Sequence, residues 1–224
     1  MLYCFQQEVK IMKKWLVVLV MMAFTGIISG CQEPIEEPEE EEEYPVEVEA
    51  YQSYLNETNP RITIEVKDHG TIVIELFYDV APNSVRNFIQ YVDVNYYDGL
   101  IFHRIIKNFM IQGGWGNNPA CAIRGEFTNN GFENPLSHTR GVISMARTMD
   151  PNSATSQFFI VHKDSPHLNE NYASFGGMVS GFDVLDSIAS VETGAQDRPL
   201  NDVVIESIRV DLRGRDIGPR ECNE

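Results

Sequence analysis

Apolar and polar residues alternate in the stretch that begins near residue 61. Apolar side chains occupy every second position of 62–66 and of 72–76, and Asp68-His69-Gly70 between them has the composition of a turn. Successive side chains of a β-strand point to opposite faces, so a period of two indicates a strand with one buried face. The two stretches together predict a β-hairpin.

A helical spacing follows the hairpin. Apolar residues recur three or four positions apart at Val85, Phe88, Ile89 and Val92. This spacing is typical of one buried helix face, and Asn83 or Ser84 is a suitable N-cap. A second helix is expected from Phe182 to Ala189.

Short apolar stretches separated by turns rich in Gly, Asn and Pro make up most of the remaining chain. They predict strands at 102–106, 109–112, 142–146, 157–161, 175–179 and 203–210. Many short strands with one early and one late helix favour a mainly β fold, in which a closed antiparallel barrel is capped by α-helices.

The N-terminus has the order of a signal peptide. Lys13 and Lys14 precede an apolar run of 14 residues, 15–28. The run is short for a membrane span, which needs ~20 residues. It ends in Ile28-Ser29-Gly30-Cys31, which resembles a bacterial lipobox. The resemblance implies a lipid on Cys31 and export to a bacterial membrane, where the domain faces the periplasm or the cell surface.

Two other interpretations of this segment remain open, an ordinary signal peptide with an incidental cysteine and an uncleaved anchor helix. We expect the signal peptide to be residues 1–30, with 1–11 dispensable because Met12-Lys13-Lys14 is itself a natural start. Ten glutamates and no Lys or Arg lie between residues 32 and 49. Such charge predicts a disordered linker over 31–57. The folded domain is then expected at 58–213 and a tail at 214–224.

Charge and residue spacing exclude several classes of site. The formal net charge is −16, much of it in the linker, and no basic stripe suits nucleic acid. The five histidines lack close ligand spacing, so no metal is expected. Cys121 and Cys222 can pair outside the cytoplasm, but two cysteines do not establish a framework. A nucleophilic Cys121 lacks a Cys-His signature around it.

Three segments concentrate unusual residues. They are Phe102-His103-Arg104-Ile105-Ile106 with Phe109-Met110-Ile111-Gln112-Gly113-Gly114, then Ser144-Met145-Ala146-Arg147, then Ser156-Gln157-Phe158-Phe159-Ile160. In this order and spacing they resemble the cyclophilin family, over about 58–213. The resemblance implies an eight-stranded barrel with two helices. It also implies an enzyme, a peptidyl-prolyl cis-trans isomerase, that needs no metal, nucleotide or organic cofactor.

The expected chemistry explains why an arginine is needed. Resonance gives the peptide C–N bond a rotational barrier of ~18–20 kcal/mol. In the twisted transition state the nitrogen regains a lone pair, which a fixed cation can meet with a hydrogen bond. Arg104 matches the family's catalytic arginine, and Gln112 matches the residue that orients it and contacts substrate.

The other site residues follow from the same resemblance. An apolar pocket for the proline ring is expected from Phe109, Met110, Phe159 and Leu168. Ala146 and Arg147 are expected to offer backbone groups to the peptide, beside Gln157. His167 and Tyr172 lie in the loop that closes the pocket, where well-known members carry Trp and His. His103 is interpreted as structural.

These expectations compete with two others. The leading hypothesis is a monomeric isomerase that acts on proline-containing segments of exported proteins and assists their folding. The runner-up is a chaperone module that binds proline peptides without turnover, which would need the pocket but not Arg104. A lipocalin-like carrier with an apolar lumen fits Arg104 and Gln112 poorly.

Overall fold

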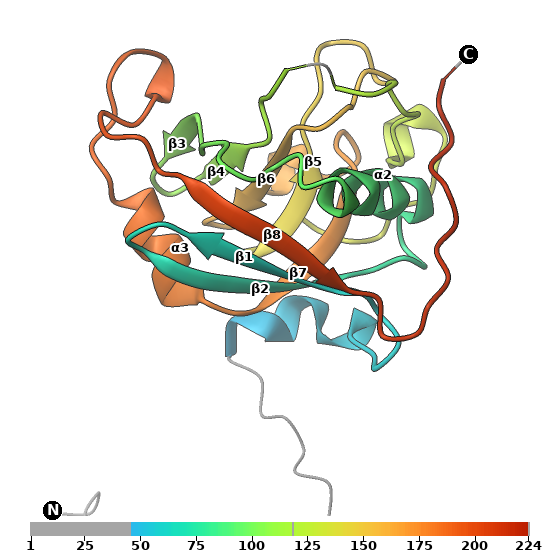
Figure 1. Cartoon of the computed structure of the whole chain (residues 1–224). Helices are drawn as coiled ribbons and strands as arrows, with labels where there is room; N and C mark the ends of the chain where they lie inside the picture. The colour runs from blue at the N-terminus through green and yellow to red at the C-terminus, as the bar shows by residue number, and fades with distance from the viewer. Residues whose placement is uncertain (1–45, 118, 224) are drawn as a thin grey trace, which may run out of the picture. The chain divides into compact units, whose positions relative to one another are not determined.

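The computed structural model describes residues 46–117 and 119–223. Its strands form one antiparallel sheet in the order β3-β4-β6-β5-β7-β2-β1-β8 (Figure 1). They are β1 (Arg61–Val66), β2 (Gly70–Leu76), β3 (Arg104–Ile106), β4 (Met110–Gly113), β5 (Val142–Met145), β6 (Phe158–Val161), β7 (Ser174–Ser180) and β8 (Ile205–Asp211). The strands predicted from the alternation of apolar residues are confirmed.

Cross-strand neighbours explain how the core is built. Ile105 pairs with Ile111, Ile111 with Ile160, and Ile160 with Ile143, so one isoleucine row runs across β3, β4, β6 and β5. All four are buried. Because paired residues share a face of the sheet, this row fixes one face as the interior and leaves the alternate residues on the outer face.

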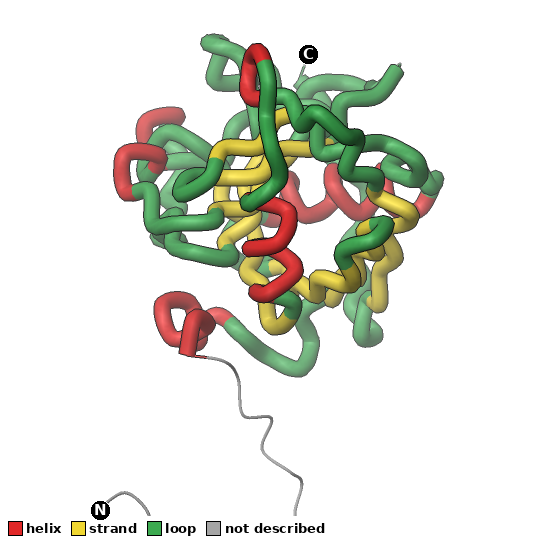
Figure 2. The backbone as a smooth tube through the Cα atoms, turned by 90° about the vertical axis from the view of Figure 1, so that its left-hand side faces the viewer, coloured by secondary structure: helices red, strands yellow, loops and turns green. Residues whose placement is uncertain are grey.

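The sheet curves strongly but does not close (Figure 2). Its end strands, β3 and β8, share no ladder. The chain before β3 meets the start of β8 at an isolated bridge, Ile101 with Val204, and through backbone hydrogen bonds, among them one of 2.9 Å from the Gly99 N–H to the Ile205 carbonyl. The predicted closed barrel is therefore wrong, and the fold is an open half-barrel. β3 has only three residues, too few to pair along β8.

Two α-helices, α2 (Pro82–Asp93) and α3 (Phe182–Ala189), lie at opposite ends of the curved sheet (Figures 1 and 2). Both helices are confirmed. Phe88 of α2 enters the core, where its ring lies 5.3 Å from Phe158 and 5.5 Å from Phe175. The expected cap is wrong, because neither Asn83 nor Ser84 caps α2.

A carboxylate that is distant in sequence caps the first turn of α2 instead. Buried Glu126 accepts hydrogen bonds from the backbone N–H groups of Asn83 (3.0 Å) and Ser84 (2.7 Å). The first N–H groups of a helix have no partner within it, and a negative charge there is favourable. Glu126, 42 positions after Ser84, thus takes the role expected of a local N-cap residue.

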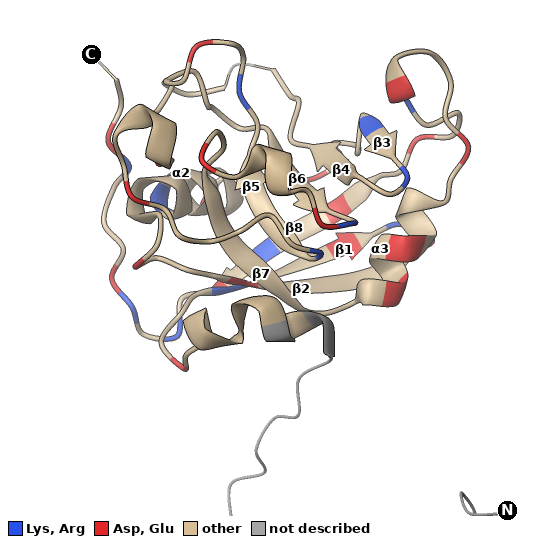
Figure 3. Cartoon of the chain, turned by 180° about the vertical axis from the view of Figure 1, so that it is seen from behind, with Lys and Arg blue, Asp and Glu red and all other residues tan. Residues whose placement is uncertain are grey.

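The part of the linker nearest the domain is folded. Residues Val46–Tyr54 form a 3-10 helix, η1, beneath β7 and β2 (Figure 3). Tyr51 is fully buried and donates a hydrogen bond to the Met178 carbonyl (2.8 Å). A Cβ on Gly177 would lie 2.5 Å from the Tyr51 ring, so only glycine fits there. The predicted disorder of 31–57 is thus wrong from Val46 onward.

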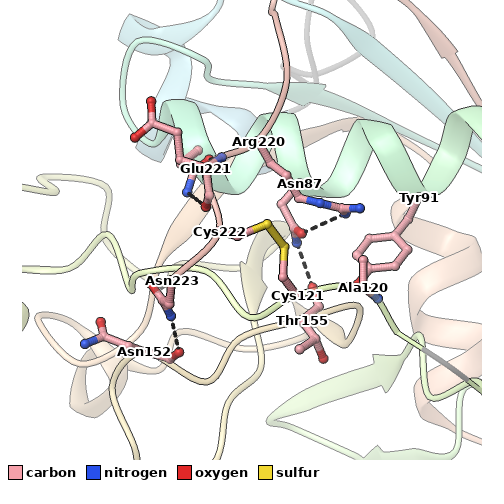
Figure 4. Close-up of a disulfide and its surroundings, with 11 residues drawn as sticks. Asn87, Tyr91, Ala120, Cys121, Asn152, Thr155, Arg220, Glu221, Cys222 and Asn223 are labelled. Atoms are coloured by element: carbon pink, nitrogen blue, oxygen red, sulfur yellow. Dashed lines mark hydrogen bonds between the residues drawn. A yellow bond between two sulfur atoms is a disulfide. The ribbon is translucent and has the colours of Figure 1, made fainter.

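The predicted tail is also folded. Residues 212–223, here called the C-terminal strap, run along α2 and end at a disulfide between Cys222 and Cys121 (Figures 1 and 4). Arg215 binds Asp79 through two contacts of 3.0 Å. The Asn83 side chain accepts from the backbone N–H of Glu221 (2.7 Å). The pairing of the two cysteines, left open by the sequence, is present.

The segment expected to be a signal peptide (1–30), Cys31 and the expected linker through residue 45 lie outside the described residues. Among the helices that are described, none has the length and apolar character needed to cross a bilayer. Within 46–117 and 119–223, no three His, Cys, Asp or Glu side chains are placed to hold a metal ion.

Candidate active site

A second row of paired residues runs across the outer face of the same strands. Arg104 on β3 pairs with Gln112 on β4, and Gln112 pairs with Phe159 on β6. These residues alternate with the buried isoleucine row, so they share the opposite face. The alternation that builds the core therefore also brings the expected cation, amide and aromatic ring together.

These residues form the wall of a pocket. It is lined by Arg104, Phe109, Met110, Gln112, Ala146, Arg147, Phe159, Leu168 and Tyr172. Nine of the residues expected from the sequence are thus gathered in one place. Gln157 and His167 are not among the lining residues but contact them. Gln157 accepts a hydrogen bond from Gln112 (3.0 Å), and the exposed ring of His167 lies 5.4 Å from that of Phe109.

Phe109 and Met110 reach the same pocket although they are neighbours in sequence. Strand alternation would place them on opposite faces. The structure resolves this because β4 begins at Met110, while Phe109 belongs to the turn that joins β3 to β4. Asn108 in that turn has a left-handed φ of 62°. The carbonyl of Phe109 accepts from the N–H of His162 (2.9 Å), which fixes the turn against β6.

Arg147 contributes its side chain as well as its backbone. Its guanidinium carbon lies 4.7 Å from the centroid of Tyr172 and 5.1 Å from that of Phe127. Nε and Nη2 both donate to the Asn171 carbonyl, at 3.1 and 2.9 Å. Arg147 therefore joins the end of β5 to the loop before β7. The N–H of Ala146 already donates to the Gln157 carbonyl (2.9 Å), so it is not available to a peptide.

A buried histidine supports the aromatic floor of the pocket. The His138 ring lies parallel to Phe159, 6.0 Å between centroids and 17° between planes. Its Nδ1 lies 3.1 Å from the Asn169 amide oxygen, and its Nε2 lies 3.1 Å from the Ser144 hydroxyl. Burial lowers the pKa of His138 to about 4, so the ring is neutral at pH 7. Sequence reasoning missed this role, because a lone histidine outside any motif gives no signal.

The hydrogen bond of Arg104 also differs from the expectation. Gln112 sits opposite Arg104 in the sheet, yet its amide donates to Gln157. The partner of Arg104 is Asp197, whose carboxylate accepts from Nε at 3.2 Å. Asp197 lies in a loop whose 3-10 turn, η4 (Ala195–Asp197), contacts β3. No pattern in the sequence singles out Asp197.

His103, next to Arg104, makes a separate contact. Its ring meets Trp115 edge to face, 5.4 Å between centroids. Burial lowers the pKa of His103, and the positive charges of Arg198 and Arg104 lower it further. A neutral, packed imidazole agrees with its interpretation as structural.

Comparison with known proteins identifies the family. A family model described as "Cyclophilin type peptidyl-prolyl cis-trans isomerase/CLD" matches residues 61–210. The chain belongs to the cyclophilin family. Peptidyl-prolyl cis-trans isomerase B of Escherichia coli is 44% identical to this cyclophilin over 157 residues, which cover 64% of this chain and 95% of that protein. Isomerisation of the bond before proline is accordingly the activity of the chain.

Two further similarities extend the comparison. A longer Streptococcus pyogenes protein, described as a bifunctional phosphatase/peptidyl-prolyl cis-trans isomerase, is 40% identical over 187 residues, which cover 69% of this cyclophilin and 39% of that protein. A crystal structure of a Cryptosporidium parvum cyclophilin, determined in the presence of the dipeptide Ala-Pro, has a TM-score of 0.61 at 29% identity. That match covers 67% of this chain and 98% of the other.

Proposed function

We propose that this cyclophilin isomerises X-Pro bonds of exported proteins and assists their folding outside the cytoplasm, from a lipid anchor on Cys31. We also propose that Arg104 stabilises the twisted amide. The observation that carries the catalytic part is the position of Arg104 in the pocket wall, beside Gln112 and near Phe159. This arrangement sets a cation beside an apolar surface suited to a proline ring.

The mechanism depends on the difference between planar and twisted amides. In the planar ground state the nitrogen lone pair is delocalised and accepts no hydrogen bond. In the twisted state the lone pair is localised, so a guanidinium N–H binds the transition state better than either ground state. The Nε–H of Arg104 donates to Asp197, and the N–H groups of the two terminal nitrogens of Arg104 remain for the amide.

The pocket floor is suited to the proline ring, which follows the bond that rotates. Met110, Phe159 and Leu168 are at most 7% exposed, and together they offer a closed apolar surface. Burial of a pyrrolidine ring there is favourable because it removes apolar area from water. We infer that the ring is held by these side chains while the preceding peptide group rotates beside Arg104.

Export has separate support. The charged, apolar and small-residue order of 13–31 is that of a lipoprotein leader. The Cys121–Cys222 disulfide agrees with it, because disulfides persist in oxidising compartments and are rare in the cytosol.

The catalytic proposal is tested by substituting Arg104. Arg104→Ala is expected to lower kcat/KM for cis-to-trans conversion of a short Ala-Pro peptide by roughly 10²–10³-fold, the usual cost of one preorganised donor. The matched control is Arg209→Ala, which removes an arginine of β8 that binds Asp98 and does not line the pocket. Circular dichroism checks that both variants fold.

The possible results separate the hypotheses. A parent that accelerates isomerisation, an inactive Arg104→Ala and an active Arg209→Ala agree with the proposal. Equal activity of Arg104→Ala and the parent would remove Arg104 from the mechanism. A parent that binds proline peptides without accelerating their isomerisation would favour the binding module instead.

A further inference from the structure

The arginine of the pocket has an acidic partner from a distant part of the chain. Asp197 follows Arg104 by 93 residues and accepts from its Nε at 3.2 Å. It does not line the pocket, whereas Arg104 does. The carboxylate therefore meets the guanidinium at Nε without being part of the pocket lining.

The loop that carries Asp197 is closed by its own backbone. Thr193 bridges Pro199, and the N–H of Gly194 donates to the Arg198 carbonyl (2.8 Å). At the tip, Gln196 and Asp197 both have left-handed backbone angles, with φ of 60° and 59°. Two consecutive residues other than glycine rarely adopt this conformation, and such strain collects at functional sites. The loop lies next to β3 (Figure 3).

Arg104 needs such a support. An arginine side chain has several rotatable bonds and loses much rotamer freedom when it is fixed. The side chain is 40% exposed, so packing alone does not hold it. Gln112, its neighbour across the β3–β4 pair, donates to Gln157. Within the described residues, Asp197 is the hydrogen-bond partner that fixes the direction of the guanidinium.

We propose that Asp197 is a positioning residue for the isomerase reaction, which holds Arg104 by Nε so that its terminal N–H groups face the amide nitrogen of the substrate. This inference rests on the proposed catalytic role of Arg104. A carboxylate also weakens the positive field of the guanidinium, which would slow catalysis. Asp197 is 45% exposed, so solvent and salt screen that effect, while the orienting hydrogen bond is local.

The test replaces Asp197 in the full chain. Asp197→Ala is expected to lower kcat about tenfold, the lower end of the loss seen when outer-shell partners of metal ligands are removed. KM should change less than twofold, because the apolar pocket is intact. Asp197→Asn should recover much of the rate, since asparagine tolerates a left-handed φ and its amide oxygen can accept from Nε.

The matched control lies just after the same loop. Asp202 binds Arg198 at 3.1 Å, whereas the carboxylate that binds Arg104 is that of Asp197. Asp202→Asn should leave both kcat and KM at the parent values. If Asp202→Asn slowed the reaction as much as Asp197→Ala, a general effect of the loop would replace the proposed contact.

Arg104→Ala and the double variant separate the two proposals. If Asp197 acts through Arg104, adding Asp197→Ala to Arg104→Ala changes the remaining rate by less than twofold. If Arg104→Ala is as active as the parent, the role of Arg104 fails and this inference fails with it. If Arg104→Ala is inactive but Asp197→Ala matches the parent, only the positioning role fails. If Asp197→Ala were faster than the parent, Asp197 would slow the reaction, and the proposed positioning role would also be overturned.

Discussion

His138 is the main residue through which the stability of the fold is expected to depend on mild acid, and His103, whose pKa burial also lowers, adds to it in the same direction. The folded pKa of His138, about 4, lies below the ~6.5 of an unfolded histidine, because burial penalises the charged ring. Between these pH values the unfolded chain binds a proton that the folded protein does not. The free energy of unfolding therefore falls as pH falls from 6.5 to 4, by on the order of 3 kcal/mol, and this contribution is constant above 6.5.

Urea denaturation from pH 4.5 to pH 8 measures this slope. His138→Gln keeps a neutral, hydrogen-bonding side chain without a titratable group, so its stability should change much less across the window. Equal slopes for the two proteins would assign the pH dependence to other groups. Asp98 and Asp186 have lowered pKa values, so their contributions to the free energy of unfolding are lost only below the pH range measured.

The site residues divide by how they reach the pocket. Arg104, Gln112 and Phe159 could be predicted because they belong to short motifs on paired strands, where the alternation fixes their face. Asp197 and His138 could not, because each comes from a loop and meets the site only through the tertiary fold. A hydrogen bond across 93 residues leaves no periodic trace in the sequence.

Secondary-structure elements that depend on local residue spacing could be predicted, whereas features that depend on contacts between distant segments could not. Strand and helix positions were predictable from the spacing of apolar residues. η1 was missed because acidic residues dominate its surroundings, while its burial depends on Val48 and Tyr51. Closure of the barrel was predicted wrongly because it depends on the pairing of β3 with β8, strands about 100 residues apart, which no local pattern specifies.

The C-terminal strap is expected to contribute strongly to stability. Its disulfide joins residues 101 apart, and closing so long a loop removes much freedom from the unfolded chain. Reduction should lower the free energy of unfolding by roughly 2–5 kcal/mol. None of the residues 212–223 lines the pocket, so isomerase activity under native conditions should be unchanged.

Urea unfolding with and without dithiothreitol measures the contribution of the disulfide. The double variant Cys121→Ser/Cys222→Ser is the control, since its unfolding midpoint should not respond to the reductant and should match that of the reduced parent. An unfolding midpoint that is the same for the oxidised and reduced parent would contradict the prediction.

At the scale of the whole molecule, the anchor is the part to test. Cys31→Ser removes the thiol that would carry the lipid, so the protein should lose incorporation of labelled fatty acid and move from the membrane to the soluble fraction. The isomerase activity of the released domain should equal that of the parent, because every residue that lines the pocket belongs to the described part from Val46 onward. A Cys31→Ser protein that stayed in the membrane would favour an uncleaved anchor helix.

The open sheet has a consequence for an enzyme whose proposed clients are unfolded. Exposed sheet edges invite strand addition, the first step of many aggregation reactions. Here β3 offers only three residues. At the other end, both backbone groups of Ile205 bind Gly99 and Leu100, and the N–H of Ile208 donates to the Asp98 side chain (3.3 Å). The sheet edges therefore offer little backbone to which an unfolded client could add a strand. Recognition of the client is left to the side chains of the pocket.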